Sequence, residues 1–457
     1  MKCIFVCIYA LCIGCVQETI PPTDDNSPQV KTSSPQFAST YSTDSQLFEE
    51  GRSLQARADF SGAESRYRQA IAAKPNNPQY NYYLGTVLHA TSRYGEARGL
   101  FEKVIKLKPD YAAPRIALGK LLYDVDGNSE AACNLLREAI RFAPQATEAR
   151  YTLALIHLRE GQSVEAIRLF SKLVEIDSSN TQARTQLGLA YLQQGDMRRA
   201  ESELKRATVS EPYYSAAFHG LGQTFIRQGK TEAGQRLLKH AQRLEEQASQ
   251  LTPHQNALRQ NPDQPQAHYN LASMYARFNR LRLAAQHFSQ AITLDSTYAL
   301  AYQGLGNLYL RLGSTPESRA TYVDRARALY LRALQLNPQL AETHNNLGLL
   351  LHSSGDVQTA VQHYKQATLI SPRTDFYQAN LSRGYLDLEQ FSKAIEAADL
   401  ALHITPTMSG ARETLGDIHA AQKDWTRALE EWEKISVQNA SSELTQKIAQ
   451  ARKQSTP

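Results

Sequence analysis

Cysteine is almost absent from most of this sequence. Four of the five cysteines, Cys3, Cys7, Cys12 and Cys15, lie at the very start of the chain, and only Cys133 lies beyond them. Cys133 can pair internally with nothing in the body of the chain, so a fold stapled by several disulfides is excluded. We expect Cys133 to be a buried, small apolar residue in a helix.

A hydrophobic run long enough to cross a membrane is missing at the start of the chain. The apolar run CIFVCIYALCIG at residues 3–14 has 12 residues, whereas a spanning helix needs about 20. Met1 and Lys2 precede this run as a small basic region. The pattern is typical of a signal peptide.

The apolar run ends in glycine directly before Cys15, and this resembles the lipobox of bacterial lipoproteins. Cys12 stands where that family usually has leucine, and Leu11 lies one position earlier. The resemblance implies a signal peptide at 1–14 and diacylation of Cys15, with two or more acyl chains holding the protein on a membrane. Val16, which is not aspartate, implies the outer membrane, so we expect an exported, periplasm-facing protein. An ordinary signal sequence, cleaved or uncleaved, is the alternative.

Residues 16–43 contain four prolines and ten serines or threonines and show no helical apolar stripe. Such a segment buries too little apolar surface to offset its chain entropy. We therefore expect residues 15–43 to comprise the lipidated cysteine and a disordered tether.

A strong charge of one sign and a catalytic signature are also lacking. The net charge is +5, and no block of basic residues appears, which argues against a nucleic acid partner. The 12 histidines form no HExxH motif or metal-ligand cluster. Gly229, Lys230 and Thr231 imitate a phosphate loop, but Thr224 replaces the glycine that such a loop needs. We expect no enzyme, no cofactor and no metal site.

What is present is an internal repeat with a period of about 34 residues. LGTVLHATSRYGEARGLFEKVIKLKP at 84–109 and LGLAYLQQGDMRRAESELKRATVSEP at 187–212 share one order: Leu-Gly, alanine, a large apolar residue, a small or apolar residue, and proline. Gly161, Gly195 and Gly229 recur at this same interval. Within each unit the apolar residues fall into two runs at helical spacing, which predicts an antiparallel helix pair.

This pattern resembles the tetratricopeptide repeat (TPR) family over about residues 44–442. The resemblance implies an all-α, right-handed superhelical solenoid of about 11 helix pairs. We expect six units at 44–248, a degenerate half-repeat or hinge at 249–264, five units at 265–442, and a capping helix and tail at 443–457. One residue is inserted near 123–127, and about eight near 314–321, which should lengthen a turn or extend a second helix.

The family binds extended peptides or partner helices in a concave groove lined by the first helix of each unit. The resemblance implies a row of groove positions two residues before each first-helix glycine or its equivalent: Tyr83, Thr152, Gln186, Asn270, Asn346 and Asn380. The candidate aromatic anchors, which are nearly as well explained by packing between repeats, are Tyr82, Tyr83, Tyr151 and Tyr269. His268 and His344 recur at equivalent places and are interpreted as groove-facing or packing residues.

A second set of groove positions is rich in arginine. It contains Arg159, Gln193, Arg227, Arg277 and Arg311, whereas the C-terminal units offer Glu342, Asp375, Asp387, Glu413 and Asp417. We therefore predict a groove that is basic in its middle and acidic at its C-terminal end. The alternative is that the arginines only favour the helix dipole and water.

These features together predict a membrane-anchored scaffold or adaptor that binds a protein partner in its groove. By resemblance to other TPR lipoproteins, its place would be an envelope assembly such as a pilus, a secretion system or polysaccharide export. A periplasmic chaperone or pilotin for one client, and a non-catalytic regulatory subunit of an envelope enzyme, are the alternatives. The pattern sets no oligomeric state.

Overall fold

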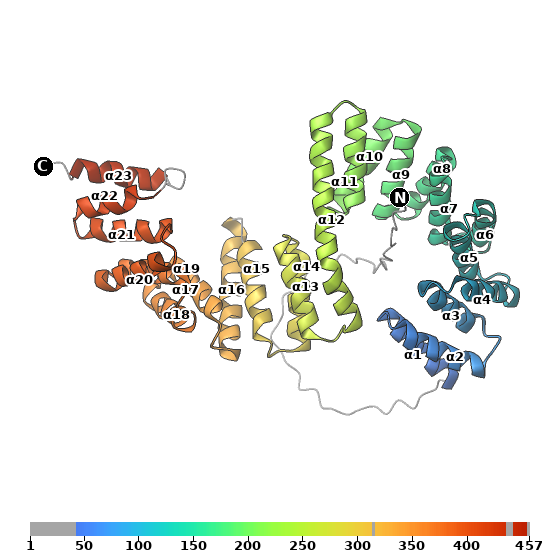
Figure 1. Cartoon of the computed structure of the whole chain (residues 1–457), viewed down its shortest axis with the longest axis horizontal. Helices are drawn as coiled ribbons and strands as arrows, with labels where there is room; N and C mark the ends of the chain where they lie inside the picture. Colours follow the sequence, from blue (N-terminus) through green and yellow to red (C-terminus); the bar gives the residue numbers. More distant parts are fainter. Residues whose placement is uncertain (1–42, 313–315, 436–441, 455–457) are drawn as a thin grey trace. The chain divides into compact units, whose positions relative to one another are not determined.

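The structure is a computed structural model that describes residues 43–312, 316–435 and 442–454. The predictions for the signal peptide, for Cys15 and for nearly all of the tether lie outside these residues. In the described ranges the chain forms 23 α-helices and no strand (Figure 1).

The first 22 helices form 11 antiparallel pairs, as the period of the repeat predicted. The first helices of the pairs are α1 (Thr43–Ala56), α3 (Pro78–Ala90), α5 (Ala112–Asp124), α7 (Thr147–Arg159), α9 (Thr181–Gln194), α11 (Ser215–Arg227), α13 (Pro265–Arg277), α15 (Ala299–Leu312), α17 (Ala341–Ser353), α19 (Asp375–Asp387) and α21 (Ser409–Ala421). The second helices are α2 (Phe60–Ala73), α4 (Tyr94–Leu107), α6 (Ser129–Phe142), α8 (Ser163–Ile176), α10 (Met197–Ser210), α12 (Thr231–Gln260), α14 (Leu281–Leu294), α16 (Pro316–Leu336), α18 (Val357–Ile370), α20 (Phe391–Ile404) and α22 (Trp425–Glu433). A final helix, α23 (Ser442–Gln454), follows.

Most pairs turn through one residue with left-handed backbone geometry. Gly195, which ends α9, has φ of 89°. The left-handed residues all occupy the same place in their pairs: Ala58, Ser92, Gly127, Gly161, Gly195, Gly229, Asn279, Gly355, Glu389 and Lys423. Glycine adopts this geometry without steric cost, whereas the other residue types are strained there. The turn is therefore dictated by the helix pairing, and glycine only makes it easier.

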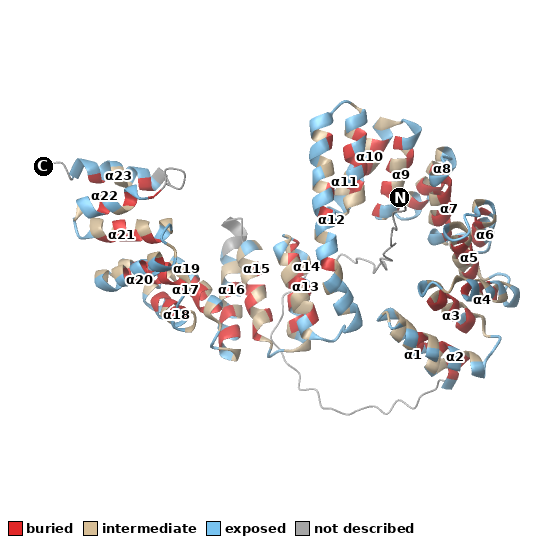
Figure 2. Cartoon of the chain, viewed as in Figure 1, coloured by how far each residue is buried: buried red, intermediate tan, exposed pale blue. Residues whose placement is uncertain are grey.

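The core of each pair is a small residue against a large one. A Cβ on Gly85 of α3 would lie 2.6 Å from the ring of Phe101 in α4, and one on Gly348 of α17 would lie 2.7 Å from the ring of Tyr364 in α18. Phe101 and Tyr364 are fully buried. The glycine thus lets the two helices approach, as the small and large columns of the repeat predicted, and the buried residues follow the packed helix faces (Figure 2).

The pairs also pack on their neighbours in chain order. Each second helix contacts the first helix of the next pair, as α8 does with α9 and α10 with α11. Cys133 in α6 is buried in the cluster shared by α6, α7 and α8, as expected of a small apolar residue. Burial raises the pKa of its thiol.

The stretch expected to hold a degenerate half-repeat or hinge is helical up to Gln260. α12 runs without interruption from Thr231 to Gln260, about 45 Å at 1.5 Å per residue. Leu251 and Leu258, near its C-terminal end, pack in the cluster of α13 and α14. The truncated unit therefore contributes a second helix without a first one, joined end to end to the preceding second helix. The helix continues through Pro253, which removes one backbone donor.

The other irregularities have simple structural outcomes. The longer insertion extends a second helix, because α16 has 21 residues where most second helices have 14. The single inserted residue lies in the turn between α5 and α6. At the C-terminal end, α23 buries Leu444 and Ala451 against Trp432 of α22, and so covers the last pair.

Candidate protein-binding surface

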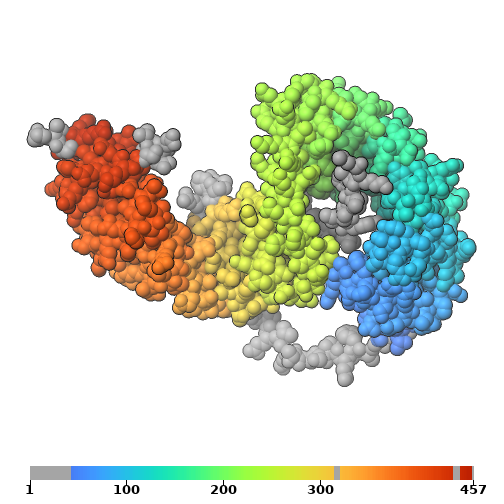
Figure 3. Space-filling model, viewed as in Figure 1, coloured from blue at the N-terminus to red at the C-terminus, as the bar shows by residue number. Residues whose placement is uncertain are grey.

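Within three runs of repeats, α5 to α11, α13 to α15 and α17 to α21, neighbouring first helices contact one another as well as the second helices, and we call the side that they form the first-helix face. α7 contacts α5 and α9, and α19 contacts α17 and α21. Repeats that are consecutive in the sequence are neighbours in space, as the order of the colours in Figure 3 shows. This first-helix face carries the residues that the TPR resemblance assigned to a groove.

Three of the four predicted arginines reach back to the preceding repeat, and two of them do so by hydrogen bonds to a helix end. Arg227 donates from Nη1 to the backbone oxygen of Leu192, 3.0 Å away in the last turn of α9. Arg311 donates in the same way to the oxygen of Ala276 in the last turn of α13, at 2.7 Å, and to Asn279. Each guanidinium thus adds a hydrogen bond to a last-turn carbonyl that already accepts from the N–H of the turn residue, Gly195 or Asn279, and places a cation at the negative end of the helix dipole.

The remaining two arginines differ from this pair. Arg159 lies 3.7 Å from Asp124, at the end of α5, and 5.7 Å from the ring of Tyr123. Arg277 is exposed, and its guanidinium forms no hydrogen bond, ion pair or ring contact within the described residues. Arg277 is therefore the arginine of this set whose charge is most available to a ligand.

The predicted asparagines are joined to the array by hydrogen bonds. Asn346 of α17 donates to the side-chain oxygen of Asn307 in α15, at 2.9 Å, and Asn380 of α19 donates to Asn345, at 2.8 Å. Asn270 accepts from Gln266 within α13. All three predicted asparagines are half-buried, so part of each side chain still faces outward.

The four predicted tyrosines are half-buried and contact other rings. Tyr82 lies 5.5 Å from the ring of Tyr111 in the next repeat, and Tyr269 lies 5.4 Å from Tyr298, also in the next repeat. Within its own repeat, Tyr151 lies edge-on to the fully buried Phe170.

Tyr83 contacts Phe48, Tyr67 and Tyr82, and Arg52 lies 5.7 Å above its ring. Contacts with other rings of the protein therefore cover part of each of the four predicted tyrosines.

The acidic residues of the C-terminal units are largely paired inside the chain. Asp417 binds Arg383 at 2.8 Å and Lys447 at 3.0 Å. Lys447 also lies 3.1 Å from Glu413. Asp387 lies 2.7 Å from the imidazole of His352.

The other two acidic residues bind uncharged partners. Asp375 accepts from Thr405, and Glu342 from Gln303 and Asn307. All five predicted acidic residues thus have hydrogen-bond or ion-pair partners inside the protein.

In two repeats an ion pair connects the first helix to the second helix, at a position that the repeat pattern alone does not indicate. Arg184 in α9 binds Glu203 in α10 at 2.7 Å, and Arg412 in α21 binds Glu431 in α22 at 3.2 Å. In both cases the glutamate lies 19 residues after the arginine. A search for charge pairs at this spacing would have found both, because the spacing is set by the pairing of the helices.

No group of three or more His, Cys, Asp or Glu residues that could hold a metal ion occurs among the described residues. Within the same ranges, none of the helices combines the length and apolar composition needed to cross a bilayer.

Comparison with known proteins agrees with the architecture. A tetratricopeptide repeat model matches residues 48–112, 185–248, 255–299 and 380–443, more than half of the chain, and further TPR models match 323–355 and 341–374. A model described as anaphase-promoting complex, cyclosome, subunit 3 matches residues 127–207.

Relatives are distant and cover only part of the chain. Anaphase-promoting complex subunit cut9 of Schizosaccharomyces pombe is 21% identical over 182 residues, covering 33% of this chain and 27% of that protein. Human tetratricopeptide repeat protein 6 is 25% identical over 166 residues, covering 35% of this chain and 31% of that protein. The chain thus matches less than a third of the length of either relative.

Among solved structures, YrrB, described as a TPR protein with an unusual peptide-binding site, is 19% identical with a TM-score of 0.37, over 44% of this chain and 97% of YrrB. The family model over more than half of the chain, together with the 11 helix pairs, shows that this protein belongs to the tetratricopeptide repeat family.

Proposed function

We propose that this protein is a membrane-anchored TPR scaffold that holds a protein partner along its first-helix face during assembly of an envelope structure. The observation that carries the proposal is the first-helix face itself. There, the first helices present half-exposed tyrosines, asparagines and the exposed Arg277. Such side chains bind a partner backbone or an acidic side chain without a catalytic group.

The anchoring part of the proposal is supported by the lipobox-like sequence before Cys15. It is tested by expressing the chain in a bacterial host fed an alkyne fatty acid. The wild-type chain is expected to carry the label and sediment with membranes, and Cys15→Ser is expected to lose both. If the Cys15→Ser chain stays labelled and membrane-bound, lipidation at this residue is disproved.

The binding face is tested by affinity capture from detergent-solubilised envelopes of the native organism, with mass spectrometry of the retained proteins. The first variant changes Arg159, Arg227, Arg277 and Arg311 together to glutamate. Because Arg227 and Arg311 also hold the preceding helices, circular dichroism must show that this variant keeps its helices.

The sharper variant is Arg277→Glu alone, because no contact with another described side chain is recorded for this guanidinium. Its matched control is Arg282→Glu, which reverses an exposed arginine on the second helix α14 of the same repeat. A partner set lost with Arg277→Glu and kept with Arg282→Glu supports the first-helix face. Retention of the same partners by all variants would show that binding occurs elsewhere. A stoichiometric client that is released on dilution would favour the chaperone alternative.

A further inference from the structure

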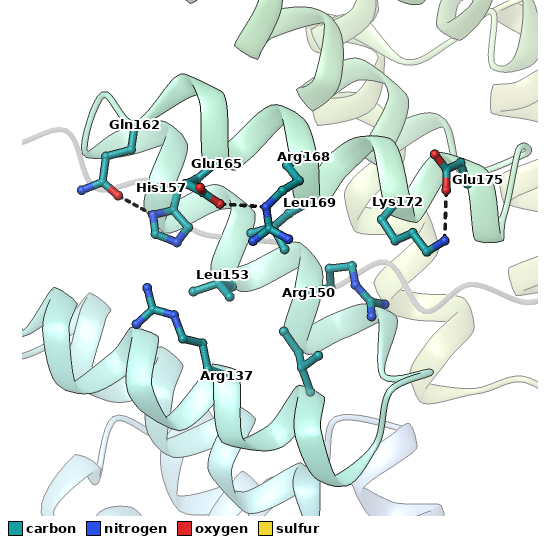
Figure 4. A pocket seen from close by; sticks show the side chains of 11 residues that line it. Arg137, Arg150, Leu153, His157, Gln162, Glu165, Arg168, Leu169, Lys172 and Glu175 are labelled. Atoms are coloured by element: carbon teal, nitrogen blue, oxygen red, sulfur yellow. Dashed lines mark hydrogen bonds and ion pairs between the residues drawn. The ribbon is translucent and has the colours of Figure 1, made fainter.

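A cavity of about 870 Å³ lies between two second helices, α6 and α8, and the first helix α7 between them. Four of its lining residues are cationic: Arg137, Arg150, Arg168 and Lys172. Figure 4 shows these side chains around the opening. The cavity is lined from the second-helix side, so it is separate from the first-helix face.

Arg150 occupies the register position at which other repeats have a paired arginine. Arg184 and Arg412 each donate to a backbone oxygen six residues earlier, and Arg150 does the same to Pro144 at 2.9 Å. The glutamates that bind Arg184 and Arg412 lie 19 residues later in the chain. The residue at the corresponding position after Arg150 is Leu169, which also lines the cavity.

Arg150 is consequently a buried cation without its carboxylate. The residue is only 9% exposed, and its Nη1 is buried and has no hydrogen-bond partner among the described residues. An arginine side chain does not lose its proton in a protein, so burial cannot be relieved by neutralisation. A buried charge of this kind is stable only when an anion or further acceptors approach it.

The carboxylates around the cavity are already engaged with other cations. Glu165 accepts from Arg168 at 2.9 Å, and Glu175 accepts from Lys172 at 3.1 Å. The hydrogen bond and charge of Arg168 lower the pKa of Glu165, with smaller contributions from His157 and Arg137. Four cations and two carboxylates leave two positive charges unbalanced, counting His157 as neutral.

We propose that this cavity binds an acidic segment of a protein partner, with an Asp or Glu carboxylate on Arg150 in the place that Glu203 takes on Arg184. The same chain shows that a glutamate fits an arginine at this register, since it does so with Arg184 and Arg412. The volume is far larger than a single carboxylate and accommodates neighbouring residues of an acidic segment. Because Nη1 is buried, side chains that line the cavity must shift to admit the carboxylate, and two of them, Arg168 and Lys172, are exposed.

The test uses the full-length chain and a fluorescent octaglutamate peptide with blocked ends, measured by anisotropy at two salt concentrations. Arg150→Gln is expected to weaken binding about tenfold or more, the usual effect of losing a charge-assisted hydrogen bond. The matched control is Arg184→Gln, whose equally buried arginine already has Glu203 as its partner. This control should bind the peptide as the wild type does.

A second variant keeps the proposal testable if Arg150→Gln fails to fold. Leu169→Glu places a carboxylate at the same spacing from Arg150 as in the paired repeats and should abolish peptide binding. Circular dichroism checks that this variant, which gives up the buried Leu169 side chain, keeps its helices. Wild-type affinity in either folded variant would overturn the proposal, as would equal binding of octaglutamine.

Two further arms separate the sources of an anion. Inorganic phosphate that binds through Arg150 while octaglutamate does not would show a small-anion site and overturn the partner proposal. Phosphatidylglycerol vesicles that bind through Arg150 in place of the peptide would overturn it in favour of a membrane surface. Capture of partners through Arg277 is a separate readout, so the two proposals fail independently.

Discussion

Two repeats of this protein join their helices at the same position with different chemistry. In the repeat of α9 and α10, Arg184 binds Glu203 at 2.7 Å. In the repeat of α13 and α14, the corresponding residues are His268 and His287, with their Nδ1 atoms 3.0 Å apart. The spacing along the chain is the same in both pairs, and both first-helix side chains also reach the backbone six residues earlier.

The difference lies in how the two pairs respond to protons. Two Nδ1 atoms at 3.0 Å require one to donate and the other to accept, and the contact of His268 Nε2 with the oxygen of Pro262 assigns a proton to Nε2. His287 is also stacked on Tyr275, 5.5 Å between ring centres, and no carboxylate of the described residues has a recorded contact with either imidazole. Burial, and secondarily His268, lower the pKa of His287 to about 4.

The histidine pair occurs twice. His344 and His363, in α17 and α18, have their Nδ1 atoms 2.9 Å apart, and His344 contacts the oxygen of Pro338. Burial lowers the pKa of both imidazoles. The same helix pairing thus supports a contact between fixed charges in two repeats, those of Arg184 and Arg412, and a contact between imidazoles in two others.

The largest loss of stability is expected from breaking the ion pair between Arg184 and Glu203. Glu203→Leu leaves Arg184, itself 7% exposed, without its carboxylate, and should destabilise α9 and α10 by about 3 kcal/mol. His287→Leu removes a neutral partner and should cost about 1 kcal/mol. Hydrogen exchange of the two repeats measures each change locally. An equal loss of local stability in the two variants would contradict the assignment of a charged contact in one repeat and a neutral contact in the other.

A lower pH should weaken the histidine repeats and spare the charged one. The unfolded chain protonates His287 near its ordinary pKa of 6.5, whereas the folded chain does so near 4. Between these values the unfolded state binds more protons, so the stability present above pH 6.5 is lost as the pH falls toward 4. Amide exchange in α13 and α14 should quicken over this range relative to α9 and α10. A uniform change in all repeats would rule out a local origin.

Replacing the histidine pair of α13 and α14 by an Arg-Glu ion pair should show whether the imidazoles cause the pH dependence. The double variant His268→Arg with His287→Glu recreates the Arg184 and Glu203 arrangement and should remove most of the pH dependence of α13 and α14. The single variant His287→Glu is its control, because it brings a carboxylate without the arginine. Persistence of the original pH dependence in the double variant would show that other groups cause it.

Substitutions in the turns of the same two repeats should change stability by a smaller amount. Gly195 has φ of 89° with open space around it, so Gly195→Ala should cost about 1 kcal/mol through backbone strain alone. Asn279 has φ of 59° in the other repeat and binds Arg311. Asn279→Gly should therefore be close to neutral, because relief of strain offsets the lost hydrogen bond. Thermal denaturation of both variants checks this, and a large stabilisation by Asn279→Gly would mean that the bond to Arg311 is worth little.

The smallest effects concern the arginines that cap the first helices of these repeats. Arg227→Ala and Arg311→Ala should each cost about 0.5 to 1 kcal/mol, because each removes a hydrogen bond to a helix end. Urea denaturation measures the loss. Arg277→Ala, with no recorded side-chain contact, is the control and should leave stability unchanged. A loss with Arg277→Ala equal to the others would show that the carbonyl contacts are not the cause.

Much of the architecture could be predicted from local pattern. The Leu-Gly pair at Gly85, the large Phe101 and the alanines around them specify two helices and the face that each buries. The continuity of α12 was harder to predict. The truncated repeat suggested a hinge at 249–264, but nothing in that stretch stops the helix as a turn glycine does, and Leu251 gains burial by continuing.

The candidate surfaces were predicted less well, because they depend on which polar side chains meet. Arg227 and Arg311 were correctly placed on first helices, yet their main contacts are carbonyls 35 residues earlier. His268 was interpreted as groove-facing or packing, and its imidazole partner lies in the second helix. Arg150 was not predicted as a site residue, because what distinguishes it is that Leu169 stands where the paired repeats have a glutamate.

The amino-acid sequence by itself determined the helix pairs, their number and their buried faces, because apolar periodicity and small-to-large complementarity act over a few turns of chain. Only the tertiary structure decided which charges are paired, which imidazoles meet and which arginine is left without a carboxylate. Those outcomes depend on the rotation and spacing of helices that are distant in the chain, and a hydrogen bond of about 3 Å is gained or lost by a shift that leaves the apolar pattern unchanged.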